Sequence, residues 1–388
     1  MRTSLLRAHV VSGLLLAVVA SPAEARTWVV HPGESIRAAV SKASSGDRVM
    51  VLPGTYREGA PGDLNAVTIS HDGIELVGRS RPGSPVVLEN AGGQSYGIWV
   101  SPANSSGPGP QADPEHPPCG LDGTTVHGFS IEGFTIRGFA VHGVHLACVD
   151  GFTMKHNVSD GNEVYGLFPI RSRDGAMVDN EAMNTGSDAA IYVGQSERVV
   201  IAHNRVHDSL LGIEVENSLD CSVVGNEVWG NTFGIFVDIL PFLETKVQAR
   251  TLVAFNSVHD NARANTAEPE DLLGVLPPGI GVLLTGADAT TVAWNSVLRN
   301  PFAGIAVTSL CTGLALQGLP CSGLDVDPDS DRNRIVHNVA QGNGTTPTGI
   351  PLLDALEADL VWDGTGTGNC WSDNVSGSSV PPVLPACP

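Results

Sequence analysis

The sequence has few aromatic and few charged residues, and it has no long apolar run after its first 25 positions. Aromatic residues make up 5% of the chain and charged residues 16%. Without a later stretch that is long and uncharged, we expect no membrane span. Only 21 Lys and Arg oppose 41 Asp and Glu, and the resulting net charge of −20 excludes nucleic acid or an anionic membrane as the main partner. It also disfavours a polyanionic substrate, unless a divalent cation mediates the contact.

Residues 1–25 have the pattern of an export signal. Arg2 and Arg7 precede the apolar run Val10–Ala20, and Ala23–Ala25 supplies a small-x-small cleavage site. The apolar run is too short to span a bilayer. We therefore expect a secreted or periplasmic mature chain that folds as one domain, residues 26–388.

All seven cysteines lie in this mature part, where disulfides are favoured. Proximity in the chain suggests the pairs Cys311 with Cys321, Cys370 with Cys387, and Cys119 with Cys148, although spacing alone does not fix connectivity. Cys221 then remains as a free thiol at a position that faces the core.

One short phrase recurs from about Val141 to Asp238. Its apolar half reads GVHL at 143, GLFP at 166, AIYV at 190, GIEV at 212 and GIFV at 234. Between these lie Asn157, Asn180, Asn204 and Asn226, separated by 23, 24 and 22 residues. A period of this size is typical of a solenoid, and the alternation within the phrase is that of a strand. Strands without helices between them predict an all-β fold, a parallel β-helix.

The recurrent asparagines are interpreted as structural. Stacked turns about 4.8 Å apart let amide side chains hydrogen-bond along a column, and Asn tolerates the left-handed backbone of a tight corner. We assign the histidines beside these corners to the coil as well: His156, His203, His207, His259 and His337.

The segment 26–60 is expected to cap the first open end of the solenoid. Ser35–Ala43 has apolar residues at helical spacing after an N-cap-like Ser, and an alternating strand follows. The stretch SIRAAVSKASSGDRVMVLPGTYRE resembles the opening of the pectate lyase-like right-handed parallel β-helix superfamily, including NosD-type periplasmic proteins. With the repeats, this resemblance covers nearly all of the mature chain. It implies a right-handed, single-stranded parallel β-helix but selects no reaction, because the superfamily holds lyases, hydrolases, epimerases and non-catalytic members.

Further coils are expected on both sides of the clean repeats. Unpatterned excursions interrupt them at 101–123, 240–250, 262–278 and 311–331. Residues 345–388 are expected to close the far end.

The variable position of each phrase should point out of the coil. Stacking the phrases predicts an outward column of His145, Phe168, Tyr192, Glu214 and Phe236. Two residues further on, Glu216 and Asp238 share a second column. We expect a surface strip of aromatic faces beside three carboxylates. Such a strip suits a polysaccharide, with His145, Phe168, Tyr192 and Phe236 as substrate-binding residues.

The three carboxylates are candidate catalytic residues. Glu214 and Glu216 should have their bases roughly 6.5–7 Å apart on one strand, and Glu216 and Asp238 roughly 5 Å apart on adjacent coils. The larger spacing suits inverting glycosidases and the smaller suits retaining ones, and crowded carboxylates raise one another's pKa. Asp188, which should point outward just ahead of Tyr192, is a fourth candidate. The alternative is a solvated ladder of acids that binds calcium or nothing.

No catalytic residues can be carried over from a known family. The polygalacturonase-like set (Asn-Thr-Asp, Asp-Asp, Gly-His-Gly, Arg-Ile-Lys) and the Asp-Pro-His-Asp signature of mannuronan epimerases are both absent. Arg171 and Arg173 leave a strand end near Phe168, where an Arg could act as the base of a lyase. The sequence therefore leaves hydrolase, lyase and epimerase open.

The run Asp325–Asn333 alternates Asp as a calcium loop does. Ser330 replaces the turn Gly, however, and Val336 stands where the final Glu is needed. We interpret the run as a solvated acidic loop and expect no cofactor and no metal site, with calcium as the alternative. Two function classes result: an exported carbohydrate-active enzyme, or a non-catalytic β-helix that binds glycan or protein. The sequence does not set the oligomeric state.

Overall fold

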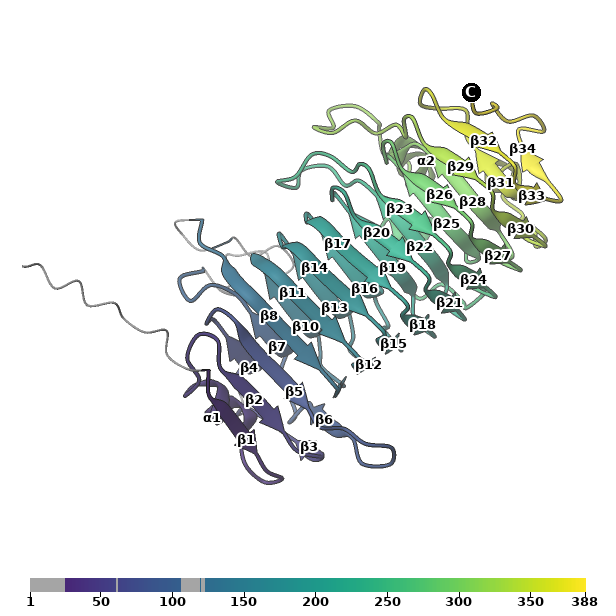
Figure 1. The fold of residues 1–388 in the computed structure, drawn as a ribbon. Helices are drawn as coiled ribbons and strands as arrows, with labels where there is room; N and C mark the ends of the chain where they lie inside the picture. The colour runs from purple at the N-terminus through teal and green to yellow at the C-terminus, as the bar shows by residue number, and fades with distance from the viewer. Residues whose placement is uncertain (1–24, 61, 106–118, 120–122) are drawn as a thin grey trace, which may run out of the picture.

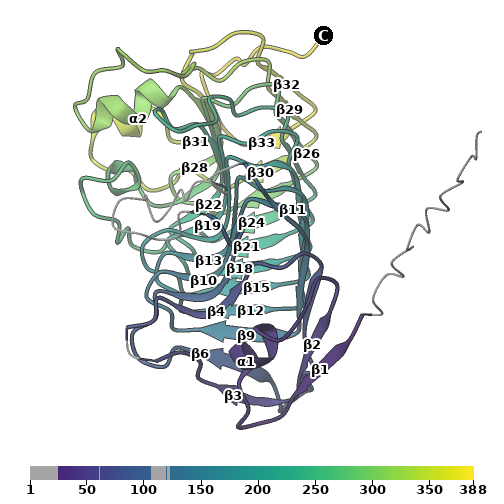
Figure 2. The same ribbon diagram turned by 90° about the vertical axis from the view of Figure 1, so that its left-hand side faces the viewer.

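The computed structural model describes residues 25–60, 62–105, 119 and 123–388. The expected export signal lies outside these residues except for its last position. The described chain winds into three long parallel sheets, each running the length of the molecule (Figures 1 and 2). Each full coil gives one strand to each sheet, as β11 (Val149–Lys155), β12 (Val158–Asp160) and β13 (Tyr165–Ile170) do.

The strands of the three sheets stack in chain order. Sheet A contains β1 (Thr27–Val30), β2 (Arg48–Val51), β5 (Ile74–Gly78), β8 (Val126–Glu132), β11, β14 (Arg173–Val178), β17 (Glu197–Ala202), β20 (Ser222–Val224), β23 (Leu252–Ala254), β26 (Thr291–Ala293), β29 (Arg334–Val336) and β32 (Cys370–Ser372). Sheet B contains β3 (Gly54–Tyr56), β6 (Val86–Glu89), β9 (Phe134–Arg137), β12, β15 (Glu181–Met183), β18 (Arg205–His207), β21 (Glu227–Trp229), β24 (Ser257–His259), β27 (Ser296–Leu298), β30 (Val339–Gln341) and β33 (Val375–Ser376). Sheet C contains β4 (Asn65–Ile69), β7 (Tyr96–Val100), β10 (His142–Ala147), β13, β16 (Ala189–Gly194), β19 (Leu211–Glu216), β22 (Phe233–Asp238), β25 (Ile280–Thr285), β28 (Ala303–Thr308), β31 (Ala358–Trp362) and β34 (Ser379–Val380).

The core fills the inside of the coil with Val, Ile and Leu from all three sheets. The inward residue of each repeated phrase meets its counterpart one coil on, as Ile191, Ile213 and Ile235 do. Each coil thus buries its apolar side chains against its neighbours. The predicted parallel β-helix is confirmed.

The asparagine column is also confirmed. Asn204 Oδ1 accepts the backbone N–H of Asn180 at 2.9 Å and its side-chain amide at 3.0 Å, and Asn204 donates in turn to Asn226. Residues just before the column, among them His156 and His203, have positive φ. The sequence analysis missed a second column at another corner, formed by Asn231, Asn261, Asn300 and Asn343.

Short helices lie where the sequence breaks the coil pattern. The cap helix α1 (Ile36–Val40) begins after Ser35, whose hydroxyl accepts the N–H of Ala38 at 3.0 Å, as expected. The excursions contain η1 (Leu273–Val275), α2 (Leu310–Leu316) and α3 (Pro351–Asp354). In the part of the chain that the structure describes, no helix is long and apolar enough to cross a membrane.

All three expected disulfides are formed: Cys119–Cys148, Cys311–Cys321 and Cys370–Cys387. Cys221 is buried and free, as predicted, and burial raises the pKa of its thiol to about 12. The thiol therefore behaves as a small apolar side chain.

Candidate active site on sheet C

The two outward columns predicted from the repeats are aligned on the outer face of sheet C. Tyr192, Glu214 and Phe236 are consecutive partners on β16, β19 and β22. Gly194, Glu216 and Asp238 are partners in the same way. On β25, Leu283 and Thr285 continue the two columns. The prediction that residues at equivalent positions of the repeat lie in one line along the coil is confirmed.

This face is not the exposed strip that the sequence predicted. The exposed fractions of Glu214, Glu216 and Asp238 are only 7%, 3% and 6%. The cause is the excursions, since Leu240 and the segment Asp271–Leu276 cover the strip and enclose a cavity of about 200 Å³ against it. The apolar residues on the outer face of sheet C form a second hydrophobic cluster, separate from the core inside the coil.

Glu214, Glu216 and Asp238 form one acid cluster in this cavity. A carboxylate oxygen of each lies within 4.8 Å of an oxygen of the others. Two features of the sequence produce this: Glu214 and Glu216 alternate with Val215 on β19, and Asp238 follows one coil later in register. This limit holds for Glu214 and Glu216 as well as for Glu216 and Asp238, so both predicted acid pairs lie close together.

Tyr192 joins the cluster through its hydroxyl, which is hydrogen-bonded to Glu216. Its ring lies beside Gly194, where an added Cβ would come within 2.6 Å of the ring. A glycine at this outward position is therefore needed so that the ring can lean toward the acids. Burial and the nearby carboxylates raise the pKa of the Tyr192 hydroxyl, so it stays protonated and can donate to a carboxylate.

The cavity disfavours charged carboxylates. Burial, followed by the charges of Asp188, Asp238 and Glu216, raises the pKa of Glu214 well above its ordinary value. Burial and the charges of Glu216 and Asp188 likewise raise the pKa of Asp238. Carboxyl groups this close cannot all ionise in a medium of low dielectric. The cluster therefore holds at least one proton under conditions where exposed carboxyls have lost theirs.

Asp188 belongs to the same site. It is hydrogen-bonded to Glu214, and its Oδ2 accepts the hydroxyl of Tyr165 at 3.1 Å. The sequence analysis missed Tyr165, which begins β13 and lines the cavity. A signal for it exists, because Tyr165, Leu211 and Phe233 each stand directly before the Gly of a phrase.

Two of the four expected substrate-binding residues lie away from the acids. His145 and Phe168 are fully buried and do not line the cavity, so their expected exposure is wrong. His145 instead stacks on Trp99 with ring centroids 4.1 Å apart, and its Nδ1 lies 2.8 Å from that of His142. Tyr192 and Phe236 are only 2% exposed, so their expected exposure is wrong as well, but they line the cavity and their role in binding stays a prediction.

The arginines considered as lyase bases are engaged in ion pairs. Arg171 contacts Glu244 of the covering excursion at 3.0 Å, and Arg173 contacts Asp150 at 2.6 Å. Neither residue lines the cavity. Arg171 instead helps to hold the covering loop.

Comparison with known protein families identifies the fold family. The model of the right-handed β-helix region matches residues 119–319, slightly more than half of the chain. The chain belongs to the right-handed β-helix family. A search of the curated proteins gave no match.

Several solved structures share the right-handed β-helix fold. The A-module of a mannuronan C-5 epimerase from Azotobacter vinelandii has a TM-score of 0.59 at 16% identity, covering 88% of this chain and 91% of that one. DFA-IIIase from Arthrobacter chlorophenolicus A6 in complex with GF2 has a TM-score of 0.56 at 15% identity, covering 91% and 88%. At such identities the likeness shows the fold alone.

Two sets of acidic residues in this β-helix are candidate cation ligands. The oxygens of the acid cluster are close enough together for a divalent ion to bind all three. In the run Asp325–Asn333, Asp325 pairs with Lys246 at 2.5 Å, and Asp331 accepts the N–H of Thr367 at 2.6 Å. These carboxylates anchor the excursion to neighbouring segments. The sequence analysis, which interpreted the run as a solvated loop, did not predict this role.

Proposed function

We propose that this protein is an exported glycoside hydrolase that cleaves a polysaccharide in the cavity over β16, β19 and β22. The observation that carries the proposal is the enclosed acid cluster, since a scaffold with a solvated ladder would have no need to bury carboxylates beneath two excursions. The three disulfides support export of the mature chain. Two proteins of similar fold, the mannuronan epimerase and DFA-IIIase, act on sugars by their names.

The environment of each carboxyl suggests its role. Glu214, with its raised pKa, is the candidate general acid that protonates the oxygen of the leaving sugar. Glu216, which lies beside the Tyr192 hydroxyl, is the candidate nucleophile. Although the bases of Glu214 and Glu216 were expected roughly 6.5–7 Å apart, an oxygen of each carboxylate lies within 4.8 Å of one of the other. This approach of the carboxyls themselves favours the retaining mechanism, in which they lie about 5–5.5 Å apart. Asp188 and Asp238 would then act on the protonation state of this pair.

The charge of the cavity favours a neutral sugar. Among the described residues that line it there is no Lys, Arg or His, whereas four are Asp or Glu from the strip and its edge, with Asp271 at the rim. A lyase or an epimerase acting on a uronate must offset the substrate's carboxylate with a cation. Hydrolysis of a neutral chain requires no such group.

The test is a panel of neutral polysaccharides with product detection. Hydrolysis should release new reducing ends, and proton NMR of the first product should show retention of the anomeric configuration. Glu216→Gln should lower the rate about 10²–10⁴-fold while the circular dichroism spectrum stays unchanged. Glu268→Gln, an exposed acid in the excursion, is the matched control. An unchanged rate for Glu216→Gln, or unsaturated ends absorbing in the ultraviolet, would contradict the proposal.

A further inference from the structure

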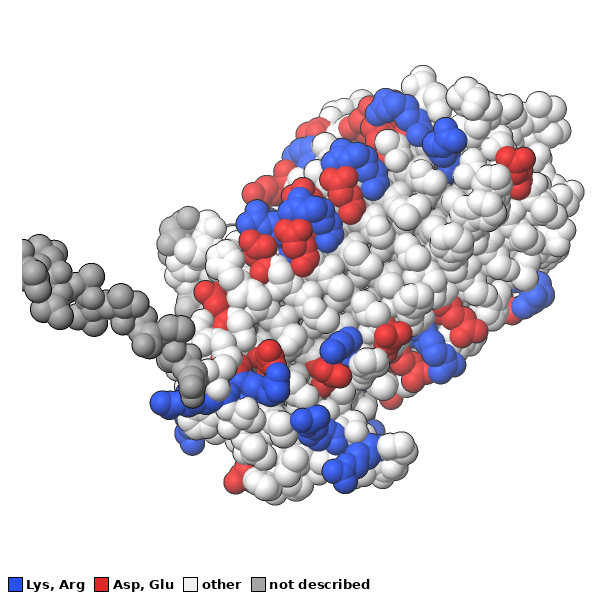
Figure 3. Space-filling view, viewed as in Figure 1, with Lys and Arg blue, Asp and Glu red and all other residues white. Residues whose placement is uncertain are grey.

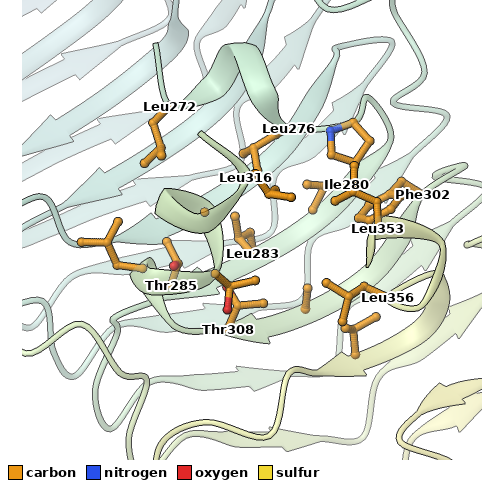
Figure 4. A pocket seen from close by; sticks show the side chains of 16 residues that line it. Leu272, Leu276, Ile280, Leu283, Thr285, Phe302, Thr308, Leu316, Leu353 and Leu356 are labelled. Carbon is orange, nitrogen blue, oxygen red and sulfur yellow. The ribbon is translucent and has the colours of Figure 1, made fainter. Parts of the chain in front are cut away.

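Beyond the acid cluster, sheet C carries a second cavity of opposite character. Its floor is formed by Leu283 and Thr285 of β25 and by Ala306 and Thr308 of β28. Its roof comes from the excursions, and Figure 4 shows Leu272, Leu276 and Leu316 above these strands. Apart from threonine hydroxyls, the side chains lining this apolar pocket are carbon, so it offers almost no hydrogen bonds.

The apolar pocket and the acid cavity are neighbours along one strip. Leu272, Leu276, Leu283 and Thr285 line both cavities. In register, Leu283 follows Phe236 and Thr285 follows Asp238, so the pocket starts one coil beyond the acids. One coil corresponds to about 4.8 Å, so a group on a sugar held at the acids can reach the pocket.

The pocket has room for a small apolar group. Its free volume is about 60 Å³. A single water needs about 10–15 Å³ by the same measure, so the volume suits a group of about four carbon atoms. An empty apolar cavity without polar partners does not hold ordered water well, whereas it readily accepts an apolar ligand.

We propose that this pocket binds a short acyl group carried by the sugar that occupies the acid cavity. The inference rests on the proposed function and deepens it: the substrate is a polysaccharide esterified with acetyl to butyryl groups. The carbonyl and ester oxygens lie toward the acid cavity, and the methyl end enters between Ala306 and the roof. The alternative is a loosely packed cluster beneath a long excursion, which would show no preference for acylated chains.

The test compares acylated and deacylated forms of the same polysaccharides. Acetylated glucomannan and acetylated xylan, each with its alkali-deacetylated form, are assayed for reducing ends and for binding to Glu216→Gln by calorimetry. A series with acetyl, propionyl, butyryl and hexanoyl esters follows. We expect about fourfold tighter binding for each added methylene up to butyryl, because each buried methylene contributes about that factor, and a loss at hexanoyl.

Filling the pocket should remove this preference alone. Ala306→Leu places a larger side chain between floor and roof, and Thr308→Leu does so from the next outward position. Both should act on acylated chains no better than on deacylated ones, with the rate on deacylated chains unchanged. Ala176→Leu, on the outer side of sheet A, is the matched control and should keep the preference.

The outcomes separate this inference from the proposed function. If chains are hydrolysed without preference for acylation, the pocket is not a subsite, although the protein is a hydrolase. If acylated chains bind better but no chain is hydrolysed by the natural protein, the pocket stands and the hydrolase proposal fails. If neither form binds or reacts, both are overturned.

Discussion

At the scale of single residues, a few buried polar side chains hold this molecule together. The asparagine column is the plainest case, because each amide satisfies backbone groups that face the inside of a corner. Asn204 Nδ2 donates to Met177 O at 2.9 Å, while its Oδ1 accepts from Asn180. A polar group buried there without a partner would give up its hydrogen bonds to water and form none in the protein.

Asn204→Ala should therefore lower the free energy of unfolding by about 2–4 kcal/mol, since it removes these bonds and leaves the Asn180 N–H without its partner. Urea denaturation followed by circular dichroism measures the change. Gln341→Ala, at an exposed position on β30, is the control and should change stability by no more than about 0.5 kcal/mol. Equal effects of the two substitutions would show that the column adds little stability.

The acid cluster should make stability depend on pH. The native pKa values of Glu214 and Asp238 lie above their ordinary values of 4.5 and 3.8. At a pH between the ordinary and the raised pKa of each group, the native state therefore binds more protons than the unfolded state. The free energy of unfolding should therefore fall as pH rises from about 4 toward the raised pKa values, by up to about 1.4 kcal/mol per pH unit for each group.

Glu214→Gln removes one of these groups and should flatten that slope, as measured by thermal unfolding in a series of buffers. Glu268→Gln should leave the slope as it is. A variant of Glu214 that kept the full slope would show that its carboxyl is not the group that binds the extra proton.

At the scale of elements, the excursions turn a flat sheet face into an enclosed site. The excursion after β22 is fastened by two polar side chains beneath it. Asn217 Nδ2 donates to Leu240 O at 2.9 Å and to Thr245 O at 2.6 Å, and Gln195 Oε1 accepts the N–H of Glu244 at 3.0 Å. Such fixed loops on a rigid scaffold are where binding residues are usually found.

Asn217→Gly should release this wall while keeping the positive φ of 44° at the position. We expect a higher KM on the substrate found by the panel and faster proteolysis within 240–250, with a smaller effect on global unfolding. Asn184→Gly, also at positive φ but exposed and away from the wall, is the control. Unchanged proteolysis in the Asn217 variant would show that other contacts hold the excursion.

At the scale of the whole molecule, the strands of each coil pair only with those of the adjacent coils, whereas the excursions reach further, as Glu244 does to Arg171. Charged side chains lie in rows along the edges of sheet A. The face between these rows is almost uncharged (Figure 3). Along one edge Arg198 pairs with Asp174, and Arg250 with Asp220 one coil further on. Stability is then close to a sum over coils and their interfaces.

Replacing both Cys370 and Cys387 by Ser should therefore loosen the C-terminal end alone. Their disulfide closes a loop of 17 residues, for which about 3 kcal/mol is expected. Hydrogen exchange should rise in β31 to β34 and stay low in β16 to β22. Replacing Cys311 and Cys321 instead should affect the α2 excursion and leave the end coils protected. Faster exchange throughout the coil in the first variant would refute the local model.

The sequence by itself determined the coil. Its period places Asn180 over Asn204 and Glu216 over Asp238, because a strand in register with its neighbour leaves no freedom in which residues align. It also marked the cysteine pairs and the cap helix, since these depend on short separations along the chain. The handedness came from the resemblance of the opening segment to known β-helices.

The tertiary structure alone decided that the strip is covered. The periodicity predicts which way a side chain points from its strand, but not which segment covers it. The segments 240–250 and 262–278 show no repeat from which their position could be predicted. The leucines of 262–278 fold back over sheet C because burial of the second hydrophobic cluster, which includes Tyr165 and Phe233, removes apolar surface from water. The same covering buries Glu214, and it gives the acids both their raised pKa values and an apolar neighbour.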